Sequence, residues 1–132
     1  MGELATDSNI NSGYGNIVVG RGAGISLHKA EQWNVFIGAS AGSKTAESVS
    51  NDASRNVFIG TKAGLENTSG QQNVAVGHWA GSGKDLTTYN GNVIIGNIAG
   101  SYNKEYGRDN VLLGNDTHLD NLLGTVIDNS TA

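Results

Sequence analysis

A short motif recurs six times along the chain and constrains its fold more than any other feature. The motif reads Asn, an aliphatic residue, a variable apolar residue, an aliphatic residue, Gly, two variable positions and Ala-Gly, as in NVFIGASAG. The copies start 17 to 22 residues apart, and all variation in length lies in the connectors. They begin at Asn16, Asn34, Asn56, Asn73, Asn92 and Asn110, the last with Thr-His in place of Ala-Gly. This period predicts units that stack on one another rather than a two-layer domain with one enzymatic cleft.

The start of each motif predicts a short, buried β-strand. Side chains alternate between the two faces of a strand, so Val35 and Ile37 lie on one face and Phe36 on the other. Both faces are apolar in all six copies, which is typical of parallel strands covered on both sides. One face is expected to fill the interior of a solenoid. The other needs a partner surface, either a second wall of the coil or another subunit.

The most constant polar and glycine positions of the motif are interpreted as structural. The opening asparagines are expected to stack in a ladder, each amide bonding to the next. The glycine after each strand permits a positive φ or the close approach of a neighbouring backbone, so it is expected to turn the chain at a corner. These glycines are Gly20, Gly38, Gly60, Gly77, Gly96 and Gly114.

Together these patterns predict an all-β fold, a short parallel β-solenoid of about six coils over residues 16–118. Residues 1–15 are interpreted as an N-terminal linker or cap. Residues 119–132 are interpreted as a C-terminal cap or a connection to a following module, with a shortened echo of the motif, NLLG, at residues 121–124. Because only 37% of the residues are hydrophobic, a single chain would have a thin core. Association of several chains is therefore expected.

Composition and spacing argue against several classes of function. The net charge is −4 with no basic run, which disfavours nucleic-acid binding, and no apolar run is long enough for direct membrane insertion. The chain has no cysteine, and His28, His78 and His118 do not show metal-binding spacing. No pair of carboxylates is placed for glycosidase chemistry. We therefore predict a protein that is not an enzyme, with no catalytic residue, no metal and no cofactor.

The NVxIGxxAG unit resembles the head repeats of trimeric adhesins, the YadA-like family, and repeats of trimeric phage tail fibres. The resemblance covers residues 16–118 and implies a left-handed β-roll assembled as a homotrimer, with an aliphatic strand face packed toward the trimer axis. It also implies attachment to a host or cell-surface receptor, glycan or protein, and an extracellular location on a virion fibre or a bacterial cell surface. The chain departs from the family in its longer coil and in the Val or Ile that directly follows each opening Asn.

Two other interpretations stay open. Residues 37–42 (IGASAG) also fit the hexapeptide unit of left-handed β-helix acyltransferases. A coil of that kind needs about three such units in succession, and the residues that follow do not continue the pattern. The other alternative is a purely structural fibre spacer that binds no ligand.

Aromatic residues outside the strands are the candidates for ligand binding. Trp and Tyr on a polar surface contact ligands by stacking on sugars or by anchoring protein interfaces. In a trimer, three weak sites would act together through their effective concentration. Tyr102 and Tyr106 form the strongest cluster, in SYNKEYGRD, and Trp79 comes next. The full set of candidates is Trp79, Tyr89, Tyr102, Tyr106 and Trp33.

Overall fold

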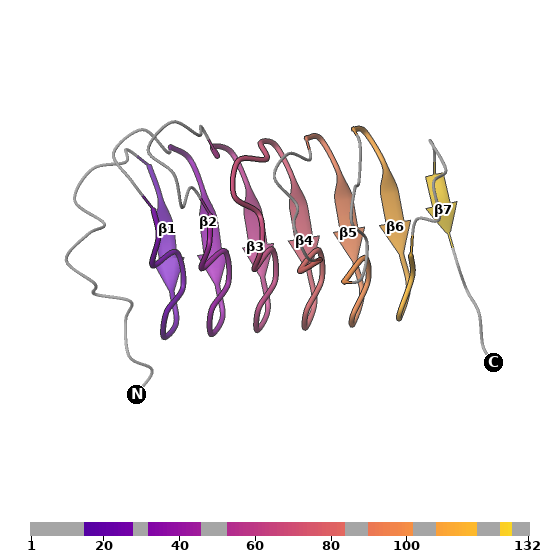
Figure 1. The fold of residues 1–132 in the computed structure, drawn as a ribbon, viewed down its shortest axis with the longest axis horizontal. Coiled ribbons are helices and arrows are strands. Elements are labelled where there is room, and N and C mark those ends of the chain that lie inside the picture. Colours follow the sequence, from indigo (N-terminus) through magenta and orange to yellow (C-terminus); the bar gives the residue numbers. More distant parts are fainter. Residues whose placement is uncertain are drawn as a thin grey trace.

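The computed structural model of the chain describes residues 15–27, 32–45, 53–83, 90–101, 108–118 and 125–127. Within these residues the fold is all-β, and seven short strands form one parallel sheet in sequence order (Figure 1). Successive strands lie side by side along the long axis of the molecule, which confirms the predicted parallel β-solenoid. The strands are β1 (Ile17–Val19), β2 (Val35–Ile37), β3 (Val57–Ile59), β4 (Val74–Val76), β5 (Val93–Ile95), β6 (Val111–Leu113) and β7 (Thr125–Ile127).

The strands pair so that equivalent motif positions lie side by side. Phe36 of β2 is paired with Phe58 of β3, and the residues before and after them are paired in the same way. The glycine that follows each strand extends the ladder, since the amide nitrogen of Gly38 donates to the carbonyl oxygen of Val19 at 2.8 Å. The connector between β2 and β3 is longer than that between β3 and β4, yet the register is the same. Connector length is therefore accommodated outside the ladder.

Within the described residues, the core is built on a row of side chains from the middle residues of β1 to β6. From β2 to β6 these side chains have no exposed surface. The alanines of the motif, such as Ala41 and Ala63, pack into the same cluster. The fully buried middle residues are Phe36, Phe58, Ala75, Ile94 and Leu112.

The first and last residues of β1 to β6 point away from this core. Their side chains are half-buried or exposed in the single chain, and the most exposed of them is Ile17, with 54% of its surface accessible. Ile37 is 37% exposed and Ile95 is 41% exposed. Of the two alternatives for the second face, a second wall of the same coil is not found among the described residues, because the core packs against only the face that carries the middle residue.

The opening asparagines form the expected ladder in the interior of the solenoid. The backbone nitrogen of Asn56 donates to Oδ1 of Asn34 at 2.9 Å, and that of Asn73 donates to Oδ1 of Asn56 at 3.0 Å. The same bond runs from Asn16 through to Asn110. Side-chain to side-chain bonds are added in the later coils, as from Nδ2 of Asn110 to Oδ1 of Asn92 at 3.0 Å. Each buried carboxamide oxygen thus accepts the backbone donor that would otherwise lack a partner.

The end of the sheet differs from expectation. The expected echo of the motif, NLLG at residues 121–124, lies outside the described residues. The strand that pairs with β6 begins at Thr125, which lies opposite Val111. The sheet therefore continues beyond residue 118 on a segment, Thr125–Ile127, that lacks the opening Asn and the closing Gly of the motif.

Candidate functional site

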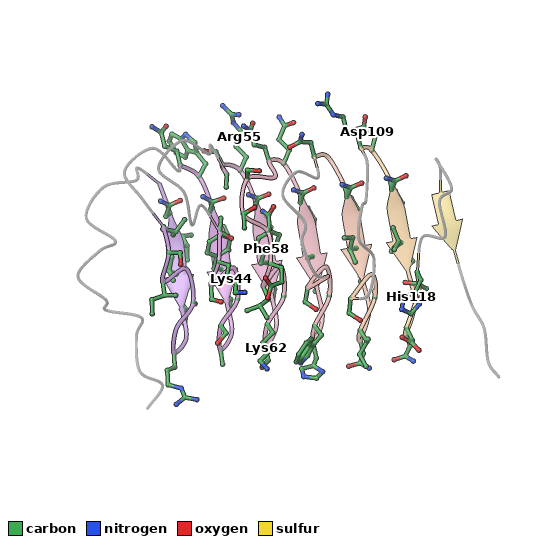
Figure 2. The ribbon with its side chains drawn as sticks, in the orientation of Figure 1. Lys44, Arg55, Phe58, Lys62, Asp109 and His118 are labelled. Carbon is green, nitrogen blue, oxygen red and sulfur yellow. The ribbon has the colours of Figure 1, made fainter. Side chains whose placement is uncertain are left out.

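Two rows of residues with positive φ run across the sheet, one where the strands begin and the other where they end. These two sides of the sheet are called the strand-start edge and the strand-end edge. The strand-start row is formed by the residue before each opening Asn, and the strand-end row by the second variable residue of each motif. All members have φ between 57° and 76°. Figure 2 shows Arg55 and Asp109 along the strand-start edge and Lys62 at the opposite edge. The strand-start row is Gly15, Trp33, Arg55, Gln72, Gly91 and Asp109, and the strand-end row is Gly22, Ser40, Lys62, Trp79, Ile98 and Asp116.

Sequence reasoning missed both rows as structural positions. The available signal was the glycine that each row carries in some copies, Gly15 and Gly91 in one row and Gly22 in the other. The remaining members are mostly large side chains, which rarely adopt a left-handed backbone conformation. The conformation is fixed by bonds between coils, such as that from the amide nitrogen of Trp79 to the carbonyl oxygen of Thr61 at 2.9 Å.

In the strand-end row, Trp79 is enclosed by its neighbours. Nζ of Lys62 lies 4.3 Å from the centroid of the indole, a cation–π contact with the adjacent coil. The imidazole of His78 meets the indole edge-on, with centroids 6.1 Å apart. Trp79 is only partly exposed, so its ring serves contacts within the chain.

Beside Trp79, exposed polar side chains form a chain of hydrogen bonds along the strand-end edge. Nδ1 of His78 lies 3.1 Å from Oδ1 of Asn97, and Nδ2 of Asn97 donates to Oδ1 of Asn115 at 2.9 Å. These bonds link three successive coils. The polar groups of this edge are thus partly engaged by one another.

The other described candidate, Trp33, lies in the strand-start row and is 59% exposed. Its indole covers the backbone of Gly15 on the preceding coil, where a methyl group added to that glycine would be 2.5 Å from Cε3 of Trp33. The glycine therefore makes room for the ring. Trp33 lies before the start of β2 and Trp79 lies after the end of β4, so the two indoles belong to opposite ends of the strands and to coils that are not adjacent.

The rest of the strand-start row continues from Trp33 with side chains that have no partner among the described residues. Arg55, Gln72 and Asp109 are exposed, and no side-chain hydrogen bond or ion pair engages them within the described part of the chain. Their backbone nitrogens are paired with the preceding coil, as from Arg55 to the carbonyl oxygen of Gln32 at 2.9 Å. The row thus has a fixed backbone and free side chains.

The remaining ligand-binding candidates, Tyr89, Tyr102 and Tyr106, lie outside the described residues, as does His28. Among the described residues, no group of three His, Cys, Asp or Glu side chains is arranged to hold a metal ion. His118 has Asp116 as an acidic neighbour, with Nε2 3.6 Å from Oδ1. The same part of the chain contains no helix with the length and hydropathy of a membrane span.

Comparison of the chain with protein-family models, with curated proteins and with solved structures found no match. The proposed function therefore rests on the fold and on the residues that it exposes.

Proposed function

We propose that this chain is a repeat module from the head of a trimeric, extracellular fibre or adhesin, which attaches to a host or cell-surface receptor. The module is a left-handed β-roll whose outward strand face packs toward a three-fold axis. Its edges display the residues that meet the receptor. The proposal rests on one observation above all, the uncovered aliphatic face of the sheet.

This aliphatic face consists of the first and last residues of β1 to β6. Every one of these positions is Val, Ile or Leu, and none of them is buried in the single chain. With strands about 4.8 Å apart and about 3.3 Å per residue, the face covers on the order of 250 Å². This area is close to that of the largest apolar patches on monomers, which are often functional, and here it is one unbroken row over six coils. A second and a third copy of the chain are the occupants we propose.

The position of the face supports assembly between copies aligned side by side. It runs along the whole stack of motif coils, so copies with parallel solenoid axes would cover it from end to end. The number three comes from the resemblance of the NVxIGxxAG unit to the head repeats of trimeric adhesins. The residues of the two edge rows, by contrast, vary between coils, as expected for a scaffold that displays different side chains at fixed positions.

The mass of the protein in solution tests the proposal. We expect sedimentation or light scattering at micromolar concentration to give the mass of three chains. Ile95→Asp should reduce it to that of one chain, because a carboxylate would be buried at the interface without a partner. The solenoid itself should stay folded by circular dichroism, since Ile95 points away from the core.

The matched control is Gln72→Asp, which adds the same charge at an exposed edge position where another coil already has Asp109. This variant should keep the mass of the wild type. A wild-type protein that has the mass of one chain at all concentrations, or an Ile95→Asp variant that assembles normally, would contradict the proposed packing.

A further inference from the structure

Trp33 is an exposed indole on a backbone position whose conformation the repeat fixes. Its backbone has φ 62°, a conformation that bulky residues rarely adopt and that Gly15 and Gly91 fill at equivalent positions. Its side chain is 59% exposed, so burial offsets little of this strain. The same conformation recurs at this position in every motif coil, so the repeat holds the backbone beneath the indole in place. An exposed indole fixed in this way is a rigid, flat platform.

The second tryptophan lacks this character, although its backbone conformation is the same. Trp79 has φ 59°, but Lys62 covers its ring and it is only partly exposed. The fold therefore gives Trp79 an internal partner, whereas Trp33 has only the backbone of Gly15 beneath it among the described residues. The structure favours Trp33 over Trp79 as a contact for a ligand.

The neighbours of Trp33 along the same edge are Arg55 on the next coil and Gln72 on the coil after it. Consecutive coils are about 4.8 Å apart, so these side chains extend from the platform at short intervals. Both side chains are exposed and unpartnered within the described residues. A guanidinium binds a carboxylate with two parallel hydrogen bonds, and a carboxamide both donates and accepts. Together with an indole they match a ligand that has a flat apolar face, hydroxyl groups and a negative charge.

The backbone of this edge favours a saccharide over a peptide as the ligand. A peptide that adds a strand needs free backbone donors and acceptors. Here the backbone nitrogens of Arg55, Gln72 and Asp109 already donate to carbonyl oxygens of the preceding coil, at 2.9, 3.1 and 3.1 Å. Recognition must therefore use side chains.

We infer that the strand-start edge around Trp33 is a binding site for a carboxylated saccharide. The sugar ring stacks on the indole of Trp33, its carboxylate pairs with Arg55, and its hydroxyl groups bond to Gln72. This inference deepens the proposed attachment function by naming the ligand class and the edge that binds it.

Intrinsic fluorescence tests the site directly because the chain has only two tryptophans. In a Trp79→Phe variant Trp33 is the sole indole, and titration with sialyllactose or with a hyaluronan tetrasaccharide should change its emission saturably. At least one of these two probes should bind, and lactose, the uncharged counterpart, should bind at least about tenfold more weakly. That factor corresponds to the loss of one charge-assisted hydrogen bond.

Two substitutions locate the contact. Arg55→Gln should weaken binding about tenfold or more, whereas Arg108→Gln, at an exposed arginine of the same edge three coils away, should leave it unchanged. A Trp33→Phe variant, with Trp79 as its sole indole, should show no saturable change. Binding that follows Trp79, binding of lactose as tight as that of the acidic probes, or no binding of either acidic probe at millimolar concentration would each overturn the inference.

The mass of every sample is measured alongside the titration. Binding through Trp33 by a protein that has the mass of one chain would contradict the trimer and support this site. A stable trimer that binds neither probe would contradict this site and support the trimer.

Discussion

The phenyl rings of Phe36 and Phe58 stack face to face in the interior, with centroids 5.1 Å apart and planes 5° from parallel. Their separation is close to the spacing of adjacent strands, because the two residues occupy the same position on paired strands. The stack is therefore a direct result of the repeat. The two rings are also the largest fully buried side chains of the described residues.

Truncation of this stack should be the most destabilising change in the core. We expect Phe58→Ala to lower the free energy of unfolding by about 3–5 kcal/mol, through lost burial and the void left behind. Phe58→Leu should lower it much less, because Leu112 fills the same position on β6. Guanidinium unfolding at one fixed protein concentration measures both, since association would make stability depend on concentration. Equal losses in the two variants would argue against an interior filled at this position.

The second glycine of the motif should be coupled to the aromatic ring beside it. A methyl group on Gly64 would be 2.6 Å from Cγ of Phe58, so Gly64→Ala must displace the ring. We expect this variant to be strongly destabilised on its own and partly rescued by Phe58→Leu. A double-mutant cycle in denaturant should show a coupling energy of at least about 0.5 kcal/mol, as for other residues in contact. Additive losses would mean that the backbone at Gly64, with φ 60°, is the whole cause.

The interior asparagine ladder should contribute to stability in a way that exposed asparagines do not. Oδ1 of Asn56 accepts the backbone nitrogen of Asn73 at 3.0 Å, and its Nδ2 donates to the carbonyl oxygen of Gly70 at 2.8 Å. Asn56→Ala removes the acceptor of the Asn73 backbone nitrogen, whereas the carbonyl oxygen of Gly70 keeps Nδ2 of Asn67 as a donor at 3.1 Å, so we expect a loss of about 1–3 kcal/mol. Asn97→Ala, at an exposed asparagine of the strand-end edge, should lose less than about 1 kcal/mol in the same thermal or chemical unfolding experiment. Comparable losses at the two sites would show that the ladder does not stabilise the stack.

The sequence predicted those parts of the fold that depend on residue type alone. Alternation of apolar residues located every motif strand, and the opening Asn and the first Gly marked interior and corner positions correctly. What it did not predict is which strand face the chain covers by itself. The covered face is the one along which the connectors return. Residue type does not distinguish the two faces, because Val35, Phe36 and Ile37 are all apolar.

The two edge rows could not be predicted because hydrogen bonds between coils override local backbone preference. Trp33, Arg55 and Ile98 carry side chains that favour negative φ, and only the glycines at equivalent positions hinted otherwise. The same limit applies to β7, whose residues lack the motif and are recognised as a strand only by their pairing with β6. For the ligand candidates, the sequence offers only residue types, whereas the exposure and internal partners that separate Trp33 from Trp79 come from the structure.

The sharpest prediction concerns the glycine after each strand, where substitution should prevent folding rather than weaken it. Gly38 has φ 130°, a conformation that L-residues rarely adopt, and a methyl group there would be 2.6 Å from both the carbonyl carbon and oxygen of Gly60. Because these atoms belong to the backbone of the next coil, Gly38→Ala can be accommodated only by separating the two coils. Gly22→Ala is the matched control, since its φ is 68° and the nearest atom to the new methyl would be Oγ of Ser40 at 3.6 Å. We expect Gly22→Ala to lose only about 1–2 kcal/mol, the ordinary cost of a left-handed residue. Gly38→Ala should show neither the circular dichroism of the wild type nor a cooperative melting transition, and cooperative melting of both variants at similar temperatures would contradict the close backbone contact between coils.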